Sequence, residues 1–96
     1  MKKTEAERFY EVFERVIREQ NLDTRMLEHR ALTVWGEVTG PYVNRITVDR
    51  RCAAGVLCVR IDSAPARQEL MMRRSRLIDA INARLGSDII KEIKFF

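Results

Sequence analysis

The clearest alternation of hydrophobic and polar positions lies in the middle of the chain. Between Gly55 and Ser63 one set of residues, Leu57, Val59 and Ile61, alternates with another, Cys58, Arg60 and Asp62. This period is typical of a strand with one buried face and one open face. Ser63 follows at an N-cap position and Pro65 in a first helical turn, so the segment predicts a strand that leads directly into a helix.

Three stretches carry apolar residues at helical spacing. Thr4 to Glu7 is typical of a capping box and begins the first helix, which continues to about Gln20. Asn21 to Asp23 offers a new cap, and Gly40-Pro41 ends the second helix. The third helix is expected from about residue 64 to residue 85. The apolar stripes are Ala6, Phe9, Phe13, Val16 and Ile17; then Leu27, Ala31, Val34 and Val38; then Ala66, Leu70, Leu77, Ile81 and Leu85.

Residues 43–53 are predicted to form a strand that pairs with the segment after Gly55. Its inward positions are Ile46, Val48 and Cys52, and its outward positions are Arg45, Thr47, Asp49 and Arg51, whereas Arg50 breaks the inward parity. A four-residue turn over 53–56 would place Cys52 opposite Leu57 and Val48 opposite Ile61. The two cysteines would then point to opposite faces. A last strand near the end of the chain should be parallel to the central one.

These elements predict one compact α+β domain over residues 1–96. The order is α-α-β-β-α-β, with a three-stranded mixed sheet and helices packed on one face.

Charge is distributed unevenly along the chain. Residues 1–40 contain 7 Lys and Arg against 8 Asp and Glu, whereas residues 41–96 contain 11 against 6, for a net charge of +4. A basic half suits a polyanion or an acidic protein partner, but it also suits a solvated surface that keeps the protein soluble.

Several classes of function are excluded by what the sequence lacks. No apolar run is long enough for a membrane span and no signal peptide begins the chain, which predicts a cytoplasmic protein without membrane contact. Two cysteines and one histidine favour free thiols and no metal site. Four glycines allow neither a P-loop nor a dinucleotide fingerprint. We therefore expect no catalytic activity, no cofactor and no small-molecule substrate.

Two side chains allow alternative interpretations. Trp35 lies at the edge of the second apolar stripe, where it is either a half-buried core residue or an interaction hot spot. Arg74 falls inside the third stripe, where either its stem packs while its head reaches water or its charge forms a ligand site.

A set of short motifs in a fixed order resembles the DciA-like family over about residues 5–96. The motifs are Trp35-Gly36, Gly40-Pro41, Thr47, Gly55-Val56-Leu57-x-Val59, Ser63, Glu69-Leu70, Leu77, Ile81-Asn82, Leu85-Gly86 and Ile93-x-Phe95. The resemblance implies a K-homology-like domain in a bacterial protein of DNA replication. Such a protein recruits or loads the replicative helicase, of the DnaB type, without ATP. The chain has Ala66 where the family often has an aromatic residue, and it has no G-x-x-G loop.

The resemblance and the basic half together suggest partners and contact residues. We expect binding to the replicative helicase and weak, salt-sensitive binding to single-stranded DNA through phosphates. The expected DNA contacts are Arg45, Arg51 and Arg60 on the open strand face, with Arg67 and Arg73 at the helix start; the expected helicase contacts are Trp35 and Tyr42. Two alternatives remain open: a general RNA-binding or nucleic-acid-binding module, and a protein interaction domain without a nucleic-acid role.

Overall fold

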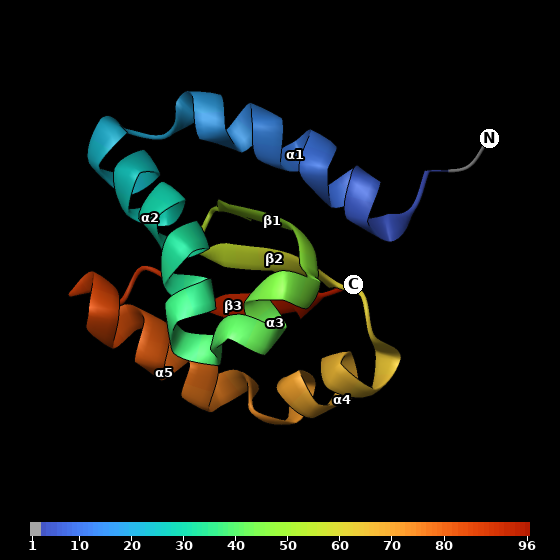
Figure 1. Ribbon diagram of the computed structural model, residues 1–96. Coiled ribbons are helices and arrows are strands. Elements are labelled where there is room, and N and C mark those ends of the chain that lie inside the picture. Colours follow the sequence, from blue (N-terminus) through green and yellow to red (C-terminus); the bar gives the residue numbers. More distant parts are fainter. Residues whose placement is uncertain (1–2) are drawn as a thin grey trace.

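The computed structural model describes residues 3–96 and forms an α+β fold around a three-stranded mixed sheet (Figure 1). Its elements are α1 (Glu5–Glu19), α2 (Leu22–Thr39), α3 (Pro41–Ile46), β1 (Thr47–Ala53), β2 (Val56–Ile61), α4 (Ala64–Met72), α5 (Arg74–Leu85) and β3 (Glu92–Phe95). The predicted fold class and order are confirmed, with one additional short helix, α3, and a division of the third predicted helix into α4 and α5. The arrangement is compatible with a K-homology-like domain.

The sheet has the order β1-β2-β3, with β1 antiparallel and β3 parallel to β2, as predicted. The turn between β1 and β2 centres on Ala54 and Gly55, which have φ values of 52° and 78°. Positive φ at both central residues is the geometry that matches the twist of a tight hairpin. Cys52 consequently lies opposite Leu57, which confirms the predicted register at this end of the hairpin.

The register at the other end of the hairpin was predicted wrongly. Thr47 pairs with Ile61 and Asp49 with Arg60, so a β-bulge places the extra residue Val48 outside the ladder. Because of the bulge, the residues of β1 that precede Asp49 point to the opposite face of the sheet from the one predicted. Thr47 is therefore buried, and Val48, predicted to face inward, is 59% exposed.

Residues 43–46 form part of α3 and not the start of a strand, which is a second correction. Gly40 enters this helix with a φ of 95°, and Pro41 occupies the first turn, where its missing N–H costs nothing. Val43 and Ile46, three residues apart, pack on the core from α3. Arg45 therefore projects from a helix and not from the predicted open strand face.

The sheet is covered on both faces, whereas one open face was predicted (Figure 1). One face, which carries Leu57, Val59 and Ile61, packs in the main core with residues of α2, α4 and α5. The opposite face packs beneath α1. This second cluster, the α1 core, contains Ala6, Tyr10, Phe13, Ala53 and Cys58. The strand alternation was read correctly, but the amphipathic first helix covers the face assigned to solvent.

The two cysteines are free and point to opposite faces of the sheet, as predicted. Both thiols are buried, and burial is the main cause that raises their pKa values above the usual value. For Cys58 the pKa rises to about 11. Both side chains are therefore protonated thiols at neutral pH and behave as small core residues.

The predicted helix boundaries rest on side-chain caps that the structure contains. Thr4 Oγ1 accepts a hydrogen bond from Glu7 N at 3.1 Å, and Ser63 Oγ accepts one from Ala66 N at 3.3 Å. Gly86 ends α5 in the left-handed conformation, with a φ of 68°. The break between α4 and α5 at Arg73 was not predicted, because the apolar stripe continues through it from Leu70 to Leu77.

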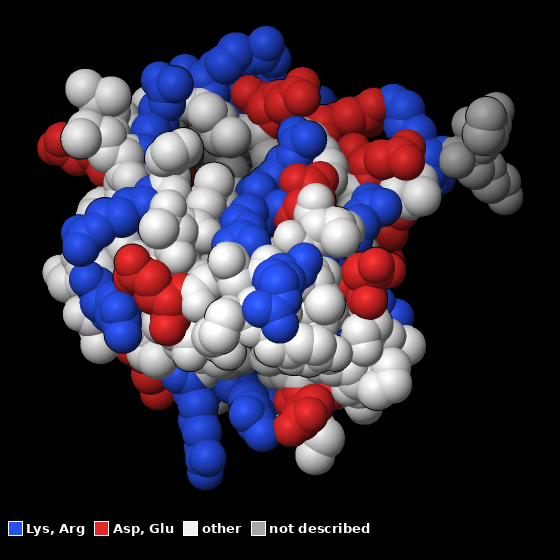
Figure 2. All heavy atoms as spheres, in the orientation of Figure 1, with Lys and Arg blue, Asp and Glu red and all other residues white. Residues whose placement is uncertain are grey.

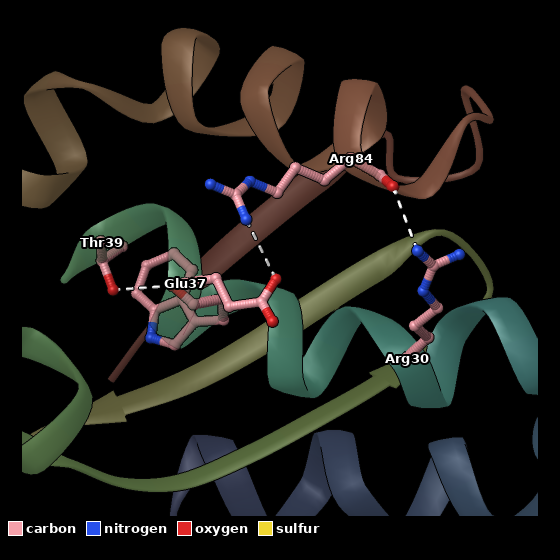
Figure 3. A network of polar contacts seen from close by, with 5 residues as sticks. Arg30, Glu37, Thr39 and Arg84 are labelled. Atoms are coloured by element: carbon pink, nitrogen blue, oxygen red, sulfur yellow. Dashed lines mark hydrogen bonds and ion pairs between the residues drawn. The ribbon is translucent and has the colours of Figure 1, made fainter. Parts of the chain in front are cut away.

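Polar contacts hold α2 against α5 at the edge of the main core (Figure 3). Arg84 of α5 forms an ion pair with Glu37 of α2 at 3.2 Å. Arg30 of α2 donates a hydrogen bond to the carbonyl oxygen of Arg84 at 3.4 Å. Both contacts are largely exposed, so they orient the two helices while apolar packing supplies most of the stability.

Candidate functional site

Arg51 and Arg60 lie on the sheet face that α1 covers. The guanidinium carbon of Arg51 stands 4.1 Å from the ring centroid of Tyr10, a cation–π geometry, and its nitrogens lie 3.9 Å from oxygens of Glu14 and Asp49. Arg60 lies opposite Asp49 in the backbone register of β1 and β2 and is half-buried. These two predicted residues therefore share one face, but as a basic rim beside α1 and not as an open strand surface.

The other three predicted arginines come from different helices. Arg45 is exposed on α3, and Arg67 of α4 donates a hydrogen bond to the carbonyl oxygen of Ile61 at 2.9 Å. Arg73 forms an ion pair with Glu69 at 2.7 Å. Among residues 3–96, no carboxylate forms an ion pair with Arg45, Arg60 or Arg67, so these three keep uncompensated positive charge.

Figure 2 shows how basic side chains are distributed on one face of the molecule. Lys and Arg atoms gather over β1 and over α3 in the middle of this face, with white atoms between the two groups and Asp and Glu atoms close to both. The basic residues of these two elements are Arg45 of α3 and Arg50 and Arg51 of β1, and we call them the basic stripe. A stripe of this kind attracts anionic partners, and the flanking carboxylates limit its width.

Trp35 is fully buried, so its predicted place at a rim is wrong. Its Nε1 donates to Thr47 Oγ1 at 3.0 Å, and Thr47 Oγ1 donates in turn to the carbonyl oxygen of Val43 at 2.7 Å. The indole also packs beside Phe95, with ring centroids 6.2 Å apart. Trp35 therefore fixes the junction of α3 and β1 from inside. Its predicted neighbour at the surface, Tyr42 of α3, is 56% exposed.

Arg74, for which two interpretations were open, is half-buried between α5 and the end of the sheet. Its guanidinium carbon lies 5.9 Å from the ring centroid of Phe95, and no group within residues 3–96 accepts a hydrogen bond from its buried Nε. The arginine packs over an aromatic ring while remaining partly exposed. The guanidinium head therefore packs partly over the Phe95 ring, with its Nε buried, and does not lie wholly in water.

Glu28 of α2 is a buried carboxylate that the sequence interpretation missed. It is 2% exposed, and its Oε2 accepts a hydrogen bond from the backbone N–H of Gly55 at 2.9 Å. It thereby ties α2 to the turn between β1 and β2. The available signal was its spacing, since residue 28 precedes Ala31 and Trp35 by three and seven positions and so shares their helix face.

A groove lies beside Glu28, between the end of α1, α2 and β1. Its volume is about 720 Å³. Its apolar walls include Ile17, Leu22, Met26 and Leu32, and Arg25, Arg50 and Arg51 also line it. The sequence interpretation did not identify this groove, because its lining comes from three elements whose mutual packing the periodicities do not specify.

The described residues do not meet the requirements of a metal site or of a membrane-spanning helix. Within residues 3–96, no group of three or more His, Cys, Asp or Glu side chains could hold a metal ion. Over the same residues, every helix is too short or too polar to cross a membrane.

A family model described as "Dna[CI] antecedent, DciA" matches residues 8–95, which is nearly the whole chain. The chain belongs to the DciA family. The motifs that suggested this resemblance lie at structural positions: Trp35 in the main core, Gly55 in the hairpin turn, Ser63 at an N-cap and Gly86 at a helix end. Membership of the DciA family places the chain in bacterial DNA replication, in a role of the helicase-loader type. A comparison with curated proteins finds no match.

Proposed function

We propose that this DciA-family chain is a non-catalytic accessory of DNA replication that binds the replicative helicase of the DnaB type and, weakly, single-stranded DNA. The family match over residues 8–95 is the observation that carries the proposal. The basic stripe over β1 and α3 supports contact with a polyanion. The lack of a P-loop is consistent with a loader that does not use ATP.

The helicase contact is assigned to the surface around Tyr42. This side chain is 56% exposed on α3, and the adjacent bulge exposes Val48 at 59%. Tyr is one of the residue types enriched at binding hot spots. Trp35 supports this surface from below, because its hydrogen bond to Thr47 fixes the end of α3, and it does not reach the partner itself.

Tyr42→Ala is expected to weaken helicase binding about tenfold or more, the loss typical of a hot-spot side chain, with the fold intact. Biolayer interferometry against the purified DnaB-type helicase of the same organism measures the change, and circular dichroism checks the fold. Met72→Ala, at an 81% exposed position on α4, is the matched control and should bind as the wild type does. A wild-type protein without affinity for the helicase would refute the proposed function, whereas equal affinities of wild type and Tyr42→Ala would refute only the assigned contact.

Binding to single-stranded DNA is expected to depend steeply on salt. Arg45, Arg60 and Arg67 keep uncompensated charge, and three phosphate contacts predict a slope of log K against log salt of about −2. Fluorescence anisotropy with a labelled oligothymidylate at several salt concentrations measures this slope. Arg45→Ala should lower its magnitude by about 0.7, one phosphate contact, while Arg8→Ala on the outer face of α1 should leave it unchanged. Undetectable binding at low salt would remove the DNA part of the proposal.

A further inference from the structure

The groove between α1, α2 and β1 is lined by large apolar side chains that are exposed to solvent. Leu22 and Met26, one helical turn apart on α2, are 66% and 61% exposed, and both line the groove. Its volume of about 720 Å³ is large enough for several side chains of a partner. Methionine adapts its shape to a partner surface more readily than branched side chains do.

The charges around the groove are predominantly positive. Arg25 and Arg50 line it, and neither forms an ion pair with a carboxylate among residues 3–96. Arg50 donates to the backbone carbonyl oxygens of Leu32 at 3.0 Å and of Asn44 at 3.3 Å, and these neutral acceptors leave its charge uncompensated. Glu28, whose carboxylate adjoins the groove, already accepts the Gly55 N–H. The groove therefore complements a partner that is apolar and acidic.

Two acceptor atoms in the groove wall also lack donors. Gln20 Oε1 and Glu28 Oε1 are buried, and nothing in the described part of the chain donates a hydrogen bond to either. Glu28 is 2% exposed, so a buried oxygen with no donor is costly. Both oxygens lie beneath the surface of the groove wall, so a polar side chain of a partner would reach them only after Gln20 or Glu28 reorients.

A nucleic acid does not fit these features. Single-stranded nucleic acids bind through basic grooves in which successive bases stack on aromatic rings, and His29 is the one aromatic ring among the described residues that line this groove, without Phe, Tyr or Trp beside it. An apolar groove is instead a usual receptor for an amphipathic helix, whose own anchors recur at i, i+3 or i+4, and i+7. The chemistry of the groove therefore selects a protein partner.

We propose that this groove binds one amphipathic helix of a protein partner, with its apolar face against Leu22 and Met26 and acidic residues facing Arg25 and Arg50. The partner's identity rests on the proposed function, which makes the helicase the protein that carries this helix. Arg50 connects the groove to the Tyr42 surface, because it also donates to Asn44 of α3. The helix would therefore bind beside the Tyr42 contact and extend one continuous interface.

Met26→Asp tests the proposal, because it places a charge against the apolar face of the bound helix. Affinity for the purified helicase is expected to fall by about tenfold or more. The matched control is Val12→Asp, which introduces the same charge at a 50% exposed position on α1 that does not line the groove, and it should change affinity by less than about twofold. Circular dichroism establishes that both variants fold.

A second variant tests the charge of the partner independently of the apolar contact. Arg25→Glu should weaken binding most at low salt, whereas Arg8→Glu, the same reversal away from the groove, should have little effect. A photo-crosslinking side chain at position 26 should label a helical segment of the helicase that is rich in Asp and Glu.

The outcomes separate the two proposals. If wild-type protein does not bind the helicase, the proposed function fails and this inference fails with it. If wild type binds but Met26→Asp and Val12→Asp behave alike, only the groove is overturned. Crosslinking from position 26 to DNA, or to a basic segment of the helicase, would also overturn it.

Discussion

Trp35→Ala is expected to lower the free energy of unfolding by about 4 kcal/mol, the usual cost of deleting a buried aromatic side chain. The indole is fully buried in the main core and packs beside Phe95. Its removal leaves a large cavity and takes away the donor to Thr47 Oγ1. A domain of this length is stabilised by only about 5–15 kcal/mol, so the variant should lose a large part of its stability and unfold at a much lower urea concentration.

Urea unfolding followed by circular dichroism measures this loss, and Trp35→Phe is the matched control. Phenylalanine keeps most of the apolar volume but not the hydrogen bond, so a loss of about 1–2 kcal/mol is expected. A folded and fully stable Trp35→Ala would contradict the core role of the indole. If Trp35→Ala binds the helicase more weakly, the loss of affinity must be compared with the fraction of unfolded protein. An unfolded protein loses every contact with its partner, whichever residue was changed.

Glu28→Ala is expected to cost about 2–3 kcal/mol of stability, mainly because it leaves the buried N–H of Gly55 without an acceptor. Glu28 Oε2 is the acceptor for that group at 2.9 Å, and Gly55 is buried in the turn between β1 and β2. The substitution also removes the side-chain hydrogen bond that ties α2 to this turn. Urea unfolding at neutral pH gives the difference.

Two variants distinguish the hydrogen bond from the loss of charge. Glu28→Gln keeps a side-chain oxygen at the same place and should remain within about 1 kcal/mol of the wild type. Glu37→Ala removes a largely exposed carboxylate of the same helix and should change stability by about 0.5 kcal/mol or less. If Glu28→Ala proved as stable as Glu37→Ala, the bond to Gly55 would have no structural importance.

The strands and helix ends were predictable because local chemistry determines them. The alternation at Leu57, Val59 and Ile61, and the caps at Thr4 and Ser63, require only neighbours in sequence. The bulge at Val48 was not predictable from the alternation, which does not show that Thr47 meets Trp35 of another element. The covering of the second sheet face by α1 was missed for the same reason: an amphipathic helix shows that it packs, but not where.

The candidate site was predictable only in outline. The family and the basic half of the chain could be read from the sequence, whereas the places of Arg45, Arg51 and Arg60 depended on the wrong start of a strand and on a face that α1 covers. Tyr42 is exposed as expected, but Trp35 is not. The groove depends on three elements meeting, and no single periodicity contains that information.

The central strand, β2, contributes alternate side chains to both cores. Leu57 and Val59 belong to the main core, and Cys58 between them belongs to the α1 core. Separation of β2 from its neighbours would therefore open both apolar clusters together. The domain should consequently behave as one cooperative unit, in which α1 and the α2–α5 layer lose their structure in a single two-state transition.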